Sequence, residues 1–183
     1  MVITWILIGL AVLIVLMFII YFNKFVVLSN RIDNSLSQID VQLKKRADLV
    51  PNLVNLVKGY MKHEKAMIEK VTDARKALLS AGNLTSKVKA GDQLQGALKS
   101  LFALAENYPA LRANENFLML QNELSAIEDK IAYARQFYND NIQSFNNAAQ
   151  TFPGVFFARL YGKSQKEYLQ ISAKEAQAPR MDF

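Results

Sequence analysis

The chain has 183 residues, of which 51% are hydrophobic and 21% charged, and a formal net charge of +6 at pH 7. It contains no cysteine, which excludes disulfides, thiolate nucleophiles, thiolate metal sites and attachment of a lipoprotein lipid. Acidic and basic residues are evenly mixed, which argues against a dedicated face for nucleic-acid phosphates.

Residues 1–22 form an apolar run without a charged side chain. A helix rises about 1.5 Å per residue, so this run would span roughly 30 Å, the thickness of the hydrocarbon core of a bilayer. A cleaved signal peptide would need a basic start, a shorter apolar stretch and small residues at the cleavage site, and the run has none of these features. We therefore predict an uncleaved transmembrane helix over residues 1–22, with Trp5 and Tyr21 at the two membrane interfaces.

Basic residues predict the orientation of this helix, because positively charged flanks stay on the cytoplasmic side of a membrane. No lysine or arginine precedes the span, whereas Lys24 and Arg31 follow it closely and a KKR run follows at residues 44–46. We expect the N-terminus outside the cell, Lys24 at the membrane interface and residues 23–183 in the cytoplasm. Attraction to anionic lipids is also expected, at about 1 kcal/mol per basic residue held near the surface.

Residues 23–183 are long enough for one domain. Glycine (7 residues) and proline (4 residues) are sparse, and the apolar residues recur at spacings of three and four, which is typical of amphipathic helices. We predict an all-α fold in which the transmembrane helix continues into an antiparallel up-and-down bundle. The bundle is expected to contain three long helices and a short C-terminal one.

The first two apolar stripes cover residues 25–43 and 50–78, and Pro51 stands at their junction. Proline cannot donate a backbone hydrogen bond and clashes with the carbonyl four residues earlier. Either Asp48 caps a new helix with Pro51 in its first turn, or one long helix is kinked at Pro51. We favour the kink, because residues 44–50 contain no glycine or asparagine with which to reverse the chain.

Turn residues delimit the next helix. Gly82 and Asn83 are expected to end the preceding segment, and Thr85 or Ser86 to cap the new helix. This helix is expected to stop at Pro109, because the residue before a proline is pushed out of helical geometry.

The longest amphipathic pattern follows Asn114, which is predicted to cap it. The pattern covers residues 117–152 at spacings of three and four, and an extra step of four at Tyr138 indicates a stutter. Beyond it we predict a short polar helix over residues 164–172 and an extended tail over residues 173–183.

Few residues suggest catalysis or metal binding. The only histidine, His63, is followed by Glu64, as at the start of an H-E-x-x-H zinc helix, but Met67 stands where the second histidine would be. Glycine-rich phosphate-binding motifs are also absent from the sequence. We therefore predict no catalytic residue, no metal site and no cofactor. Four charged residues are expected to form interhelical or solvent-facing ion pairs: Arg75, Glu123, Glu128 and Arg135.

Two groups of residues are candidates for an interaction surface. The first is a polar stripe, whose members recur at spacings of three or four: Asp40, Lys44, Asp48, Asn52 and Asn55. This polar stripe is either a solvated face or a partner-binding face. The second group lies beyond the longest pattern and is aromatic: Phe156, Phe157 and Tyr161. The sequence is compatible with three roles for this aromatic group: a cap of the bundle, an oligomer contact or a membrane-surface contact. It does not decide among them.

Several extended strings resemble the LemA proteins, a family that is widespread in bacteria. They occur along nearly the whole chain: IDVQLKKRADLVPNLV (residues 39–54), VKGYMKHE (57–64), AENYPALRAN (105–114), ARQFYND (134–140), FP (152–153) and APRMDF (178–183). The resemblance implies a single N-terminal membrane helix with an extracellular N-terminus, followed by a cytoplasmic helical bundle. It implies no enzymatic activity.

We expect a non-enzymatic scaffold or adaptor that is anchored in the bacterial plasma membrane and acts at its cytoplasmic face. Its expected partners are the lipid bilayer, further copies of the chain and an unidentified protein, and no nucleic acid is expected. Two alternatives are a protein that binds anionic lipids and shapes the membrane, and a metal-dependent enzyme that uses His63 and Glu64.

Overall fold

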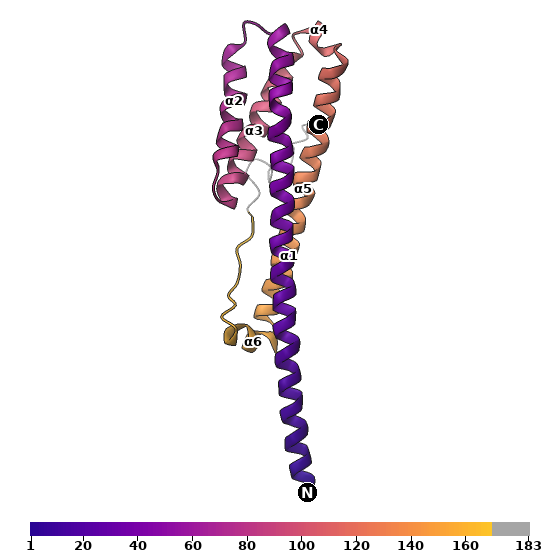
Figure 1. Cartoon of the computed structure of the whole chain (residues 1–183), viewed down its shortest axis with the longest axis vertical. Helices are drawn as coiled ribbons and strands as arrows, with labels where there is room; N and C mark the ends of the chain where they lie inside the picture. Colours follow the sequence, from indigo (N-terminus) through magenta and orange to yellow (C-terminus); the bar gives the residue numbers. More distant parts are fainter. Residues whose placement is uncertain (170–183) are drawn as a thin grey trace, which may run out of the picture. The chain divides into compact units, whose positions relative to one another are not determined.

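The computed structural model describes residues 1–169, which form helices and no strands, so the predicted all-α fold is confirmed. Figure 1 shows the helices in chain order. Their bounds are α1 Val2–Tyr60, α2 Lys65–Ser80, α3 Leu84–Ala105, α4 Pro109–Arg112, α5 Glu115–Gln150 and α6 Gly154–Leu160.

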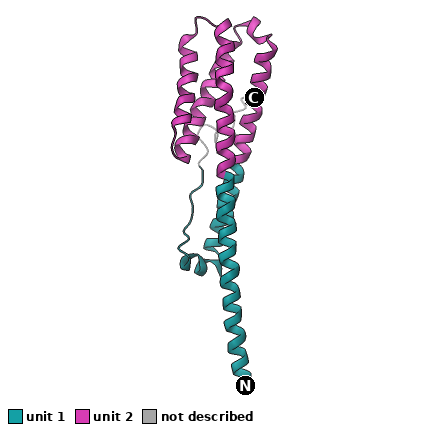
Figure 2. Ribbon diagram, in the orientation of Figure 1, with its two compact units in different colours: residues 1–35, 136–183 teal, residues 36–135 magenta. Residues whose placement is uncertain are grey.

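The chain divides into two compact units, which are coloured separately in Figure 2. Unit 1 contains residues 1–35 and the chain from residue 136 onward, and unit 2 contains residues 36–135. The divisions fall inside α1 and α5, so each of these two helices contributes to both units.

The first part of α1 is apolar and exposed. Its most apolar 18-residue window has a mean hydropathy of 3.1, and none of that window is buried. Within residues 1–22 all side chains are exposed except Met17 and Tyr21, which are half-buried. This stretch is long enough and apolar enough to cross a membrane, and such a surface matches lipid better than water.

Helix α1 continues through Pro51 without interruption, so the interpretation of a new helix capped by Asp48 is wrong. Proline lacks an N–H, and therefore leaves the carbonyl of Ala47, four residues earlier, without its helical donor. Arg75 of α2 replaces this donor: its Nε donates to the Ala47 carbonyl oxygen at 2.7 Å. A side chain from a neighbouring helix thus stabilises the proline inside α1.

The chain reverses at residues 61–64, ten residues beyond Pro51, so the expected second stripe is divided between α1 and α2. Met61 at the start of this turn is fully buried, and its N–H donates to the Val57 carbonyl at 2.8 Å. Because a residue of the turn itself packs in the core, the apolar spacing passes through the turn unchanged. The spacing of apolar residues alone therefore did not reveal the turn between α1 and α2.

Helix α3 begins one residue after Asn83, which is its N-cap. The Asn83 side chain accepts a hydrogen bond from the Ser86 N–H at 2.8 Å, and the Ser86 hydroxyl accepts one from the Asn83 N–H at 3.2 Å. This reciprocal pair is a capping box. Assigning the cap to Thr85 or Ser86 was therefore wrong, although Ser86 takes part as the third helical residue.

Helix α3 ends at Ala105, and Pro109 is the first residue of α4 instead of the end of α3. Proline is favoured at the first helical position, because its missing N–H would have had no partner there. The predicted cap of α5 is confirmed, since the Phe117 N–H donates to Asn114 Oδ1 at 3.2 Å.

The region after α5 differs from the expectation. Phe152 is 81% exposed, although it was expected to close the apolar stripe of α5. A helix forms at α6, and the described part of the predicted helix 164–172 is not helical. The remainder of that segment and the predicted extended tail, residues 173–183, lie outside the described residues.

Each unit has its own apolar core. In unit 1 the part of α1 that follows the exposed apolar stretch packs against the end of α5, where the ring centroids of Phe25 and Phe145 lie 5.7 Å apart. In unit 2 the core is built by α1, α2, α3 and α5, and it includes these fully buried side chains: Ile39, Leu53, Met61, Val71, Leu94, Leu101, Phe117 and Ile131.

Candidate functional site

The polar stripe lies along the part of α1 that belongs to unit 2. Four of its members are exposed: Lys44, Asp48, Asn52 and Asn55. Asp40 is half-buried and accepts a hydrogen bond from Lys87 Nζ of α3 at 2.6 Å. Asp40 therefore contributes to packing of α3 on α1, while the other four residues form a continuous surface.

A buried arginine lies on the core-facing side of the same part of α1. Arg46 is 2% exposed, and one of its guanidinium nitrogens, Nη1, donates to the Gly91 carbonyl of α3 at 3.2 Å. Its Nη2 donates to the Glu128 carboxylate of α5, and Gln95 Nε2 donates to the other oxygen of the same carboxylate. One charged group on α1 thus connects three helices.

Gly91 permits this close approach of α1 and α3. A Cβ atom at residue 91 would lie 2.7 Å from Leu43 Cδ2, well inside the distance at which two carbon atoms are in contact. The absence of a side chain at Gly91 lets its carbonyl come within reach of Arg46. The close packing and the buried charge therefore occur at the same place.

A second ion pair lies near Arg46. Arg135 Nη2 of α5 donates to Asp92 Oδ1 of α3 at 2.5 Å, and both side chains are largely buried. Burial is the main reason that the pKa of Arg46 is lowered from its usual range to about 10. The positive charge of Arg135 also lowers this pKa, and the negative charge of Asp92 partly opposes the two effects. Arg46 is still a cation at neutral pH, so it holds charge and does not act as a base.

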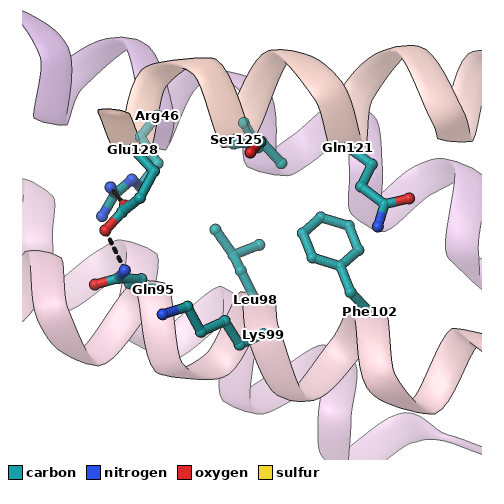
Figure 3. A pocket seen from close by; sticks show the side chains of 9 residues that line it. Arg46, Gln95, Leu98, Lys99, Phe102, Gln121, Ser125 and Glu128 are labelled. Atoms are coloured by element: carbon teal, nitrogen blue, oxygen red, sulfur yellow. Dashed lines mark hydrogen bonds and ion pairs between the residues drawn. The ribbon is translucent and has the colours of Figure 1, made fainter. Parts of the chain in front are cut away.

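A cavity of about 190 Å³ adjoins the Arg46–Glu128 pair (Figure 3). Figure 3 shows Gln95 and Glu128 at one end of it and Phe102 at the other. Residues of α3 and α5 line most of the cavity, with Arg46 from α1 at the polar end. Pockets for drug-sized ligands typically enclose roughly 300–1,000 Å³, so this one has room for only a few waters or a very small molecule.

The His63–Glu64 pair lies in the turn between α1 and α2. His63 is exposed, and Glu64 Oε1 accepts a hydrogen bond from the Tyr108 hydroxyl at 3.1 Å. This hydrogen bond is the main reason that the pKa of Tyr108 is raised, and desolvation adds to it. In the described part of the chain, no group of three or more His, Cys, Asp or Glu side chains is placed to hold a metal ion.

The four residues expected in ion pairs have different environments. Glu128 and Arg135 form the interhelical pairs described above, with Arg46 and Asp92 as partners. Arg75 donates to a backbone carbonyl instead, and Glu123 is exposed.

The aromatic candidates lie on α6 in unit 1, and they face different ways. Phe157 stacks on Tyr21 of α1 at 4.8 Å between ring centroids, and the ring of Tyr161 lies 5.1 Å from that of Phe18. The Tyr161 hydroxyl also donates to the Phe18 carbonyl at 2.7 Å. Phe156, in contrast, is 62% exposed. Phe157 and Tyr161 therefore attach α6 to α1, and Phe156 does not.

The predicted membrane-interface residues lie on α1. Lys24 Nζ lies 5.6 Å from the ring centroid of Tyr21, so these two residues form a cation–π contact beside α6. Trp5, near the other end of the apolar stretch, is 72% exposed.

Two asparagines of α5 bind the backbone of the segment after α6, and the sequence analysis missed both. The Asn146 side chain accepts from the Lys166 N–H at 2.8 Å and donates to the Lys166 carbonyl at 2.9 Å. Asn139 makes the same pair of hydrogen bonds to Leu169, at 2.9 Å and 3.1 Å. The asparagines lie seven residues apart on one face of the helix, a spacing that was available in the sequence as a signal.

Arg46 was also missed as a core residue, because it was read only as part of a basic flank. Its position continues the apolar spacing of α1 through four buried residues: Leu43, Arg46, Val50 and Leu53. A charged residue at a core position of a helix is a direct sign of a buried partner.

The chain is similar to one known family and to several curated proteins. Residues 35–183 match the model of the LemA family. The chain is 25% identical over 175 residues to magnetosome protein MamQ 2 of Paramagnetospirillum magneticum, a match covering 81% of this chain and 64% of that protein. Magnetosome protein MamQ of Magnetospirillum gryphiswaldense is 25% identical over 173 residues, covering 80% of this chain and 64% of that protein.

Protein LemA of Metamycoplasma hominis is 30% identical to the chain over 124 residues, which cover 67% of this chain and 57% of that protein. The chain therefore spans less than two thirds of the length of each of these curated relatives. The family match covers most of the chain, including all of unit 2. The chain belongs to the LemA family.

Proposed function

We propose that this protein is a non-enzymatic scaffold, anchored in the membrane by α1, whose bundle lies at the cytoplasmic face and binds a second copy of the chain. The observation that carries the proposal is the exposed polar stripe. Lys44, Asp48, Asn52 and Asn55 lie on the same helix as the apolar membrane segment, with no loop between them. A surface that carries a positive charge, a negative charge and two amide groups suits a partner that presents the same groups in return.

The pairing of the interior charges supports a structural role for the bundle. Arg46 and Arg135 each pair with an acidic residue on a neighbouring helix, so both charges join helices of the bundle. Breaking a buried ion pair is costly, which makes such pairs suitable for fixing helix positions.

Self-association can be tested by crosslinking the full chain in native membranes. A photoreactive amino acid at Lys44, Asp48 or Asn52, in cells that express two differently tagged copies, is expected to give adducts containing both tags. The matched control places the same group at Tyr133, which is 72% exposed on α5. Equal yields from Tyr133, or no mixed adducts from the stripe, would exclude the stripe as the contact.

The cytoplasmic placement can be tested separately, because the chain has no cysteine of its own. A single cysteine replacing the exposed His63 is expected to react with a membrane-impermeant maleimide only after the cells are permeabilised. A cysteine replacing Val2 is expected to react in intact cells. The opposite pattern would reverse the topology and contradict the cytoplasmic part of the proposal.

A further inference from the structure

Helix α6 exposes a row of large apolar side chains. Phe152, just before the helix, is 81% exposed, Phe156 is 62% exposed and Leu160 is 66% exposed. Phe156 and Leu160 are spaced four residues apart, which places them on one side of the helix, and the ring centroid of Phe152 lies 5.9 Å from that of Phe156. Such a row on a short surface helix costs free energy in water, so it indicates a surface that is covered in the working protein.

The other side of α6 is attached to α1 at one level. The ring contacts of Phe157 and Tyr161 with α1 lie within residues 18–25, where the apolar stretch gives way to polar sequence. The hydrogen bond from Tyr161 to the Phe18 carbonyl fixes the end of α6 at the same level. Figure 1 shows α6 running across the direction of α1, as a helix lying in the plane of a membrane surface would.

The charged side chains of α6 and of the residues next to it in the sequence are basic. Residues 152–166 contain no acidic side chain, and their basic residues are Arg159, Lys163 and Lys166. Arg159 and Lys163 are exposed, and Lys24 lies on the adjacent turn of α1. Basic residues beside an exposed apolar row are typical of helices that bind the headgroup region of anionic bilayers.

We propose that α6 is an interfacial membrane-binding helix. Phe152, Phe156 and Leu160 enter the boundary between headgroups and acyl chains, in the leaflet that α1 reaches at residues 18–25, and Arg159 and Lys163 bind anionic headgroups. A lipid surface is favoured over a second copy as the occupant, because the row adjoins the membrane-spanning stretch of the same unit. This surface is distinct from the polar stripe and goes beyond the scaffold proposal.

Fluorescence quenching by lipids tests the proposal on the full chain in nanodiscs that contain anionic lipid. The only tryptophan is replaced by W5F, and F156W then provides a single reporter. We expect blue-shifted emission that decreases when the lipids carry bromine on their acyl chains. The matched reporter Y133W, at an exposed position on α5, is expected to show red-shifted emission and no quenching.

Three outcomes would overturn the proposal. The first is F156W emission typical of water without quenching by bromolipids, and the second is equal quenching of Y133W. The third is blue-shifted emission that bromolipids do not quench and that disappears when each nanodisc holds one chain. That result would show that a second copy of the chain covers the row.

Proteolysis gives an independent readout. The variant F152S/F156S/L160S changes only exposed side chains, so α1 is expected to stay in the membrane during alkaline extraction. Trypsin is expected to cut it after Arg159 and Lys163 much faster than it cuts the unchanged chain in the same nanodiscs. The control L118S/M119S, which alters exposed apolar residues of α5, is expected to leave this cleavage unchanged. Equal cleavage of the triple variant and the unchanged chain would contradict membrane protection of α6.

Discussion

At the scale of single residues, Arg46 is a buried side chain that connects three helices of unit 2. Removing it leaves the partly buried Glu128 carboxylate with Gln95 as its only remaining side-chain donor among those described here, and it opens a void at the cavity. We expect R46A to lower the free energy of unfolding by about 3 kcal/mol, the lower end of the range for breaking a buried pair, because Glu128 is 31% exposed.

Denaturation of the full chain in detergent, followed by circular dichroism, measures this loss. The control is K45A, which removes an exposed cation next to Arg46 and is expected to change stability by less than about 0.5 kcal/mol. Similar losses for the two variants would show that the buried pair contributes little.

Tyr108 gives a prediction about pH. Its hydroxyl donates to Glu64, so the folded chain holds the phenol proton to a higher pH than the unfolded chain does. The resulting stabilisation is fully present below the unfolded pKa of about 10 and is lost as the pH rises through the folded pKa. We expect E64A to lower the pKa of Tyr108, since the acceptor and its negative charge are removed.

NMR titration of labelled tyrosine measures this pKa, and the Y108F variant identifies the signal. H63A changes the exposed neighbour and is expected to leave the pKa where it is. An unchanged Tyr108 pKa in E64A would show that the hydrogen bond is not made in solution.

At the scale of helices, the sequence predicted which segments form helices better than it predicted the residues at which those helices begin and end. The spacing of apolar residues was sufficient for α3 and α5, and Asn114 was correctly identified as a cap because its side chain acts on its own helix. The turn at residues 61–64 was missed because Met61 packs in the core like a helical residue. The partner of Arg46 could not be predicted either, because their contact requires the packing of three helices that are distant in the sequence.

The segment after α6 was predicted as a helix because its polar sequence has no strong breaker. Instead, Asn139 and Asn146 hold the backbone of this segment. Their side-chain amides form hydrogen bonds with N–H and C=O groups that would pair with each other within a helix. We expect N146A to speed hydrogen exchange at the Lys166 amide about tenfold, since losing two hydrogen bonds costs roughly 1.4 kcal/mol or more.

Exchange followed by mass spectrometry tests this expectation. The neighbouring Asn147 is exposed, and N147A is the matched control. Exchange that is equally fast in both variants would mean that Asn146 does not hold the segment.

Pro51 and Arg75 form a coupled pair within unit 2. R75A removes the donor that serves the Ala47 carbonyl and is expected to cost about 1 kcal/mol, since Arg75 is only half-buried. P51A restores an N–H for the same carbonyl, so the cost of R75A is expected to be smaller in the P51A background. A double-mutant cycle measures this coupling, and strictly additive effects would show that Arg75 does not compensate for the proline.

At the scale of the whole molecule, α1 is both the membrane segment and the first helix of the bundle. The sequence predicted this continuity from the absence of a linker after residue 22, and the structure contains a single helix, Val2–Tyr60. The resemblance to LemA proteins identified the family from strings that include the polar stripe of α1, but strings alone do not show which side chains are exposed.

If the continuity of α1 matters for self-association, then an anchor of the same length is not enough. We expect a chain whose residues 1–22 are replaced by an unrelated span, joined through a flexible Gly/Ser linker, to reach the membrane but to lose the mixed-tag crosslinks from Lys44 and Asn52. The same unrelated span fused without a linker, so that the helix stays continuous, is the control and is expected to keep them. A flexible linker lets each copy turn independently, and the entropy of orienting two such surfaces opposes their contact. Full retention of the crosslinks with the flexible linker would show that the apolar segment acts only as an anchor, and the polar stripe would then associate without help from the helix that carries it.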